Sequence, residues 1–238
     1  MQYGIVIVVE DLNLELLKPL KTGVEVKYGL SKIVLNEQGR LEACDPYGCV
    51  NIRIPVGDEI YIEPIPATTR PQQLTECLYV EFTEPIAFGG GKLSLWFLAP
   101  FELAITYKER IVTSISPTKV KFTLVGDIVN GVVCRYHRSM VGFSRDDVVD
   151  YVESGLGFVR AEVKGKAATI SGVGFYVAGF PLYVDEEGLV YYPLVEAEVG
   201  EGAMENKTTT NPPFKGLRAI LKWKRYVLAP SLTQPVQR

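Results

Sequence analysis

The chain has 238 residues, of which 47% are hydrophobic and 22% are charged, and its net charge is −3. This composition is typical of a globular protein with a sizeable core and excludes a disordered chain. The small net charge also argues against a protein that binds a polyanion over its whole surface.

The N-terminal residues MQYGIVIVVE favour a strand. The apolar run is short, no basic residue precedes it, and Glu10 and Asp11 follow it at once. A signal peptide begins with basic residues, and a membrane-spanning helix needs about 20 apolar residues. We therefore expect a cytoplasmic protein without membrane insertion.

Short apolar runs rich in Val, Ile, Tyr and Phe recur along the chain and are separated by Gly, Pro, Asp and Asn, a pattern typical of strands and turns. We predict a mainly β fold, an antiparallel sandwich or barrel-like set of layers with one or two short helices. The predicted strands are Tyr3–Val9, Gly23–Tyr28, Lys32–Leu35, Arg40–Cys44, Cys49–Pro55, Glu59–Ile65, Cys77–Phe82, Lys92–Leu98, Glu102–Tyr107, Arg110–Ser116, Val120–Val125, Gly131–Tyr136, Phe158–Val163, Ala167–Val177, Leu189–Val199 and Leu217–Leu228.

The sequence Asp45-Pro46-Tyr47-Gly48 matches a type I turn and predicts a hairpin that brings Cys44 and Cys49 together. Opposed residues in a hairpin are close enough for a cross-strand disulfide, but the interpretation that we favour is two reduced thiols, with the disulfide as the alternative. The spacing does not match a metal site and there is no second close pair, so we predict no metal and no cofactor. Cys77 and Cys134 lie in apolar runs and are expected to be buried, inert thiols.

The segment Cys134-Arg135-Tyr136-His137-Arg138-Ser139 contains the only histidine of the chain. Arg135, His137, Arg138 and Ser139 could together bind an anion or a partner, with the histidine as a base. On a strand, Arg135, His137 and Ser139 share one face, and the interpretation that we favour is a polar outer face, with the anion or catalytic site as the alternative. No nucleophile elbow surrounds any serine, and no catalytic residue is predicted.

A helix is predicted over residues 144–155, where Ser144 can cap the first turn and Gly155 can end the last one. This segment gives a candidate boundary between a β-rich domain of residues 1–142 and a second β-rich segment of residues 143–238. One continuous domain is the alternative, because sheets can extend across such a boundary.

Opposite charges follow one another near the C-terminus, with seven acids in residues 181–205 and seven basic residues in residues 206–238. The first interpretation is a hairpin of Leu189–Val199 with Leu217–Leu228, in which the charges pair across strands. The loop 200–213 would then be long for a hairpin, and either mobile or bound to a partner. The second is a surface for RNA or a ribonucleoprotein, with aromatic stacking beside the cations. Its residues would be Lys215, Arg218, Lys222, Trp223, Lys224 and Arg225.

Four segments in the middle of the chain have a distinctive pattern, and they are Tyr61–Pro66, Leu78–Pro85, Phe122–Asp127 and Asn130–Ser139. In these segments the chain resembles an archaeal family of proteins of unknown function. The resemblance implies a β-rich, cytosolic protein, and some members occur alongside mechanosensitive channels. The family brings no catalytic residues, and its pattern often has Trp where this chain has His137.

These features favour contact over catalysis. We expect a non-catalytic protein-interaction or assembly module that forms homo-oligomers or binds a protein partner, because exposed sheet edges are surfaces for pairing. Binding of RNA through the basic C-terminal segment is one alternative. A small anionic-ligand binder or enzyme around Arg135 and His137 is the other.

Overall fold

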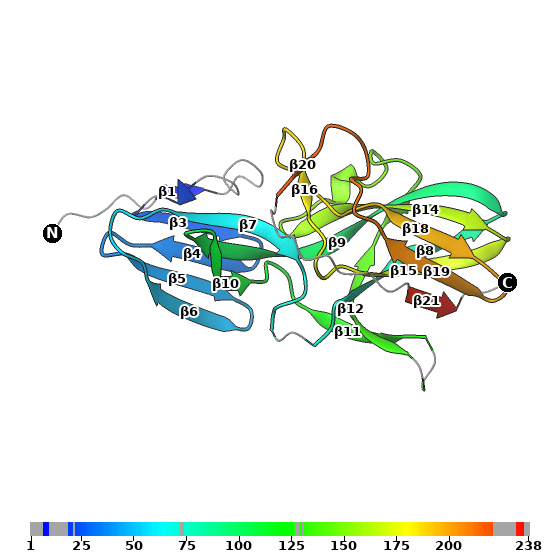
Figure 1. The fold of residues 1–238 in the computed structure, drawn as a ribbon, viewed down its shortest axis with the longest axis horizontal. Helices are drawn as coiled ribbons and strands as arrows, with labels where there is room; N and C mark the ends of the chain where they lie inside the picture. Colours follow the sequence, from blue (N-terminus) through cyan, green and yellow to red (C-terminus); the bar gives the residue numbers. More distant parts are fainter. Residues whose placement is uncertain are drawn as a thin grey trace.

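A computed structural model describes residues 7–9, 19–20, 22–71, 74–126, 129, 131–220 and 232–235. These residues form three β-sheets, and the prediction of a mainly β, layered fold is confirmed. Figure 1 shows a flat group of strands at one end, a curled group at the other, and one hairpin that projects below the second group. The helical part of the described chain is one 3-10 turn, η1 (Val149–Tyr151).

The N-terminal sheet has five strands in the order β1-β3-β4-β5-β6. β1 pairs with β3 in parallel, and the other pairs are antiparallel. Alternate residues of β4 and β5 are buried, as expected for a sheet with one face on the core. The strands are β1 (Ile7–Val9), β3 (Val24–Tyr28), β4 (Ser31–Leu35), β5 (Arg40–Asp45) and β6 (Gly48–Arg53).

The largest sheet is organised around β9 (Gly91–Tyr107), which pairs with β14 along its first half and with β7 along its second half. Pro100 lies at the change of partner, where its missing N–H costs no ladder bond. The other strands are β2 (Pro19–Leu20), β7 (Ile60–Pro66), β10 (Arg110–Ile115), β13 (Val141–Gly142), β14 (Leu156–Gly165), β16 (Tyr183–Val184), β17 (Val190–Tyr191), β18 (Val195–Val199), β19 (Ala203–Thr208), β20 (Arg218–Ala219) and β21 (Leu232–Pro235).

The third sheet has the order β11-β12-β8-β15. β12 pairs with β8 in parallel. The pair of β11 with β12 and the pair of β15 with β8 are antiparallel. The side chains of Leu78, Val80 and Phe175 cover the main core from this sheet. Its strands are β8 (Cys77–Phe88), β11 (Lys121–Val125), β12 (Val132–Ser139) and β15 (Ala168–Tyr176).

One apolar core links the three sheets, because its buried residues extend from Leu20 to Met204. The ladder between β9 and β14 also crosses the predicted boundary at residue 142, as the one-domain alternative requires. We keep that alternative as our interpretation.

The helix predicted over residues 144–155 is wrong. The carboxylate of Asp147 accepts hydrogen bonds from the backbone N–H groups of Phe143 and Ser144, each at 2.8 Å. This local bonding competes with a helix, and only the turn η1 forms.

The predicted hairpin of Leu189–Val199 with Leu217–Leu228 is also wrong in the described part of the chain. β18 lies between β14 and β19, so both its edges are occupied. Strand β19 forms within residues 200–213, where a long loop was expected, and Glu196 faces Lys207 across the ladder. Cross-strand pairing of opposite charges therefore exists, but with a nearer strand.

Candidate functional site

The four residues singled out around the histidine lie on β12 and face different surroundings. Arg135 is 1% exposed and Ser139 is 5% exposed, whereas Arg138 is exposed. Ser139 accepts a hydrogen bond from the backbone N–H of Leu98 at 2.9 Å and donates one to a main-chain carbonyl at 2.6 Å. The face shared by Arg135, His137 and Ser139 therefore points toward the core, and the favoured interpretation of a polar outer face is wrong.

Arg135 can be buried because it forms an ion pair with Glu102 of β9. The guanidinium Nη1 donates to Glu102, whose side chain is fully buried. The same carboxylate accepts from the backbone N–H groups of Thr69 at 3.0 Å and Arg70 at 2.9 Å, and from the Thr69 hydroxyl. Removing either charged partner would leave the other buried without compensation, which is strongly unfavourable.

A second arginine extends this network to the N-terminal sheet. Arg70 donates from Nε and Nη2 to the two carboxylate oxygens of Asp45, at 2.8 and 2.9 Å. Burial raises the pKa of Asp45, but hydrogen bonds from Arg70 and from the N–H groups of Tyr47 and Ser116 outweigh it and hold that pKa below its usual value. The tip of the β5–β6 hairpin is thereby fixed to the body of the molecule.

The two arginines differ in how their guanidinium groups are used. Arg70 binds Asp45 through Nε and Nη2, the edge that suits a bidentate acceptor. On Arg135, no described residue accepts from these same two nitrogens, although both are buried. Buried donors normally have partners, so this edge of Arg135 has capacity for a small acceptor.

His137 lies two residues beyond Arg135 on the same strand. Burial, and to a smaller extent the charge of the nearby Lys121, lowers its pKa to about 4. The imidazole is therefore neutral at pH 7. A neutral imidazole adds no positive charge to an anion site, so Arg135 would have to supply it alone.

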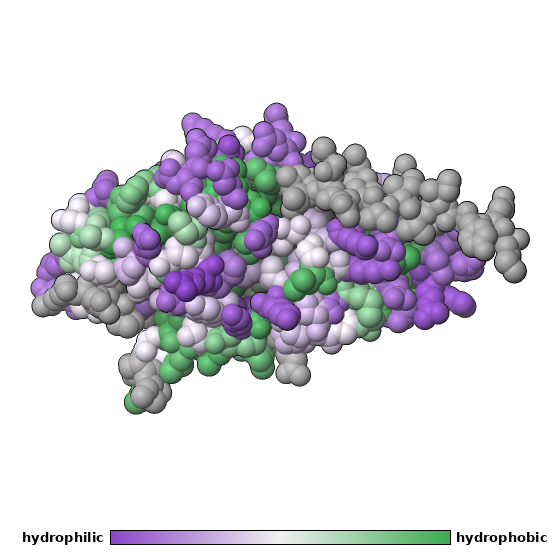
Figure 2. All heavy atoms as spheres, turned by 180° about the vertical axis from the view of Figure 1, so that it is seen from behind, coloured by the Kyte–Doolittle hydropathy of each residue, from purple (hydrophilic) through white to green (hydrophobic). Residues whose placement is uncertain are grey.

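Beside this anchored strand, the β11–β12 hairpin exposes apolar side chains. Phe122 is 37% exposed, Leu124 is 47% exposed and Val133 is 48% exposed. Phe122 faces Arg135 and Leu124 faces Val133 in the ladder, so the three lie on the face that covers the core on β8. We call Phe122, Leu124 and Val133 the overhanging face. Figure 2 shows apolar residues gathered at the lower edge of the molecule, where this hairpin projects.

The opposite face of the hairpin is fixed by a disulfide. Cys77 on β8 and Cys134 on β12 are joined, and both are fully buried with Val125 beside them. The expectation of free, inert thiols is therefore wrong for this pair. The parallel pairing of β8 with β12 places the two cysteines together, and no local pattern signals it.

Cys44 and Cys49 are also joined by a disulfide, across the β5–β6 hairpin. With Glu42 they are also the residues that, among those described, could gather around a metal ion. Disulfides are typical of oxidising compartments and of proteins from hyperthermophiles. A cytoplasmic location remains a prediction.

The residues predicted to contact RNA fall in two groups. Lys215 and Arg218 are exposed, and Arg218 belongs to β20. Lys222, Trp223, Lys224 and Arg225 lie outside the described residues. RNA binding remains a prediction.

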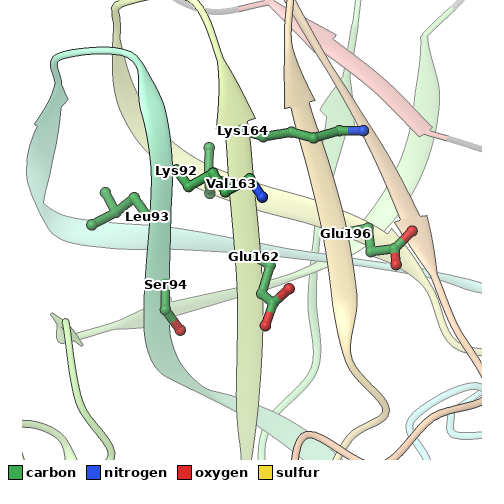
Figure 3. Close-up of a pocket in the computed structure, with 7 residues that line it drawn as sticks. All are labelled: Lys92, Leu93, Ser94, Glu162, Val163, Lys164 and Glu196. Atoms are coloured by element: carbon green, nitrogen blue, oxygen red, sulfur yellow. The ribbon is translucent and has the colours of Figure 1, made fainter.

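A shallow hollow crosses the outer face of β9, β14 and β18 (Figure 3). Its charged lining already pairs locally, because Glu162 lies 2.9 Å from Arg160 and Lys164 lies 3.0 Å from Glu198. None of its charged residues is buried. Such an arrangement is typical of a solvated sheet face.

Sequence reasoning missed Glu102, Thr69, Arg70 and Asp45. The one available signal was Glu102 itself, a single carboxylate within the apolar run from Leu95 to Ile105. A charge in such a run must meet a partner or a ligand when it is buried.

Comparison with known proteins identifies the family of the chain and nothing more specific. No curated protein and no solved structure matches it. Within the described residues, no helix has the length and apolar character needed to cross a membrane. Residues 18–228 match the model of the family described as protein of unknown function (DUF432). The chain therefore belongs to this family, which is one of unknown function, as the resemblance noted from its sequence implied.

Proposed function

We propose that the protein is a non-catalytic assembly module that pairs with a second copy of itself through strand β11. The observation that carries this proposal is the overhanging face, which lies beside an open strand edge. Among the described strands β11 pairs with β12 alone. An open edge with apolar side chains is a ready surface for strand addition.

The sequence of β11 suits pairing with an identical strand. In a two-fold antiparallel arrangement centred on Thr123, Phe122 of one copy faces Leu124 of the other. Lys121 then faces Val125, so no like charges meet. Each apolar cross-strand pair contributes about 0.2–1 kcal/mol, and the backbone bonds of the open edge are satisfied at the same time.

Light scattering of the full chain over a range of concentrations tests this proposal. We expect a dimer for the wild type and a monomer for Leu124→Asp, with unchanged circular dichroism. Val56→Asp is the matched control, because Val56 is 71% exposed but lies far along the chain, after β6. It should remain dimeric. A wild type that is monomeric at all concentrations, or a dimer that persists in Leu124→Asp, would exclude this interface.

The unused edge of Arg135 supports a second candidate, the binding of a small acceptor such as a carboxylate. Since Glu102 already balances the guanidinium charge, this binding should be weak. Acetate and nitrate, titrated against the wild type, should raise the thermal unfolding midpoint. Arg135→Lys lacks the forked edge and should not respond. An equal response in both proteins would contradict the candidate.

A further inference from the structure

We propose that the β5–β6 hairpin carries a thiol-controlled metal site. Reduction of the Cys44–Cys49 disulfide releases two sulfur ligands, which then bind one zinc ion together with the carboxylate of Glu42. This site is separate from β11 and does not depend on the assembly proposed above.

The three ligands lie on one face of the hairpin. Cys44 is directly opposite Cys49 in the ladder, and Glu42 is two residues before Cys44 on the same strand. Their ligand atoms all lie within 4.8 Å of one another. Alternation along β5 places Glu42 beside Cys44, and pairing with β6 adds Cys49, so three groups that zinc accepts lie together.

The distances fit a tetrahedral ion after a small opening of the sulfur pair. Zinc–sulfur bonds of about 2.3 Å and zinc–oxygen bonds of about 2.1 Å give ligand separations of about 3.5–3.8 Å in a tetrahedron. The Sγ atom of Cys44 already lies 3.6 Å from Oε1 of Glu42. The two Cα atoms are 4.0 Å apart, so rotation of the cysteine side chains can separate the sulfurs without moving the strands.

A reductant can reach this disulfide. Cys49 is exposed and Cys44 is half-buried, whereas Cys77 and Cys134 are both 0% exposed. Exposed disulfides are the ones that exchange with thiols. A dithiol reductant gives one hydrogen to each sulfur and leaves as its own cyclic disulfide. Zinc then displaces the two thiol protons to solvent.

Charge favours a divalent cation in the reduced state. Glu42 and two thiolates together carry three negative charges. On the adjacent strand, Lys32 is the residue paired with Cys44, but its ammonium lies 2.9 Å from Glu25. A zinc ion offsets two of the three charges, and a water molecule can complete its fourth position.

The hairpin should keep its place in both states. Asp45 points to the opposite face, where Arg70 and the N–H of Ser116 hold it. The docking of the hairpin tip thus depends on a different set of contacts from those at the metal ligands.

The test uses the full chain, reduced with a phosphine that leaves no competing thiol. Zinc binding is measured by competition with a chromogenic chelator, and cobalt substitution reports thiolate ligation by its charge-transfer absorption. We expect one zinc ion per reduced chain, none in the oxidised chain, and protection of Cys44 and Cys49 from alkylation by zinc. Glu42→Gln should weaken binding at least about tenfold, since even indirect partners of a metal matter that much.

Two variants show whether the ion is held by these ligands or elsewhere on the chain. The double variant Cys44→Ser, Cys49→Ser should bind no zinc while its circular dichroism stays that of the wild type. Glu37→Gln changes an exposed carboxylate between β4 and β5, leaves the ion pair of Lys32 with Glu25 intact, and should bind as the wild type does. The proposal is overturned if the reduced, folded chain binds no zinc, if cobalt shows no thiolate band, or if the double variant still binds.

Discussion

The strands β6 and β11 both lie at the edge of a sheet, but their exposed side chains have opposite character. β6 exposes Asn51 and Arg53, and its hairpin tip is tied to the body through Asp45. β11 exposes Phe122 and Leu124 at its open edge. A polar edge resists pairing with another chain, whereas an apolar edge invites it. The first hairpin is held by contacts within the chain, and the apolar edge of the second is the reason for the dimer that we propose.

The largest expected effect concerns the anchor of the second hairpin. Arg135→Met leaves the carboxylate of Glu102 buried without its guanidinium, and should lower the free energy of unfolding by about 3–5 kcal/mol. Urea denaturation measures it. In the double variant Arg135→Met, Glu102→Gln, no charge is left unpaired and the amide oxygen still accepts from Thr69 and Arg70. The double variant should lose less stability than Arg135→Met and Glu102→Gln lose together. A loss equal to the sum of these two single losses would contradict an interaction between Arg135 and Glu102.

The pH dependence of stability tests the environment of His137 on β12. The folded-state pKa of His137, about 4, lies below the unfolded value of about 6.5, so the unfolded chain binds more protons between these values. The stability associated with neutral His137 is fully present above about pH 6.5 and is lost as the pH falls toward 4. Between about pH 7.5 and 4 the wild type should lose about 3 kcal/mol more than His137→Gln. Parallel pH profiles would refute the lowered pKa of this half-buried histidine.

The anchor of the first hairpin should be weaker. Asp45→Asn removes a charged, bidentate partner from Arg70, at an expected cost of about 1.5–3 kcal/mol. Glu42→Gln, on the opposite face of the same strand, should stay within about 0.5 kcal/mol of the wild type. Thermal or urea unfolding compares the two, and equal losses would show that Asp45 does not fix the hairpin tip.

The smallest expected change in stability accompanies the largest change in assembly. Leu124→Lys on β11 should alter the free energy of unfolding of the monomer by less than about 0.5 kcal/mol and yet abolish the dimer. Asn51→Lys on β6 should change neither property. Sedimentation velocity of both variants at matched concentrations provides the measurement. Dimers of equal strength in the two variants would remove the distinction between the edges.

Several parts of the site follow from short-range patterns. The turn at residues 45–48 placed Cys44 opposite Cys49, because a hairpin of known turn length has a defined register. Alternation also placed Arg135, His137 and Ser139 on one face of a strand. It could not say that this face points inward, because that depends on which sheet packs against it.

Periodicity and turn residues within a few positions were enough to predict the β character, most strand positions and the hairpin at residues 45–48. Three features could be found only in the folded chain: the ion pair of Glu102 with Arg135, the disulfide of Cys77 with Cys134 across 57 residues, and the open edge of β11. These features arise from pairing between distant strands. Such pairing is set by the burial of the whole apolar core, and no single segment encodes it.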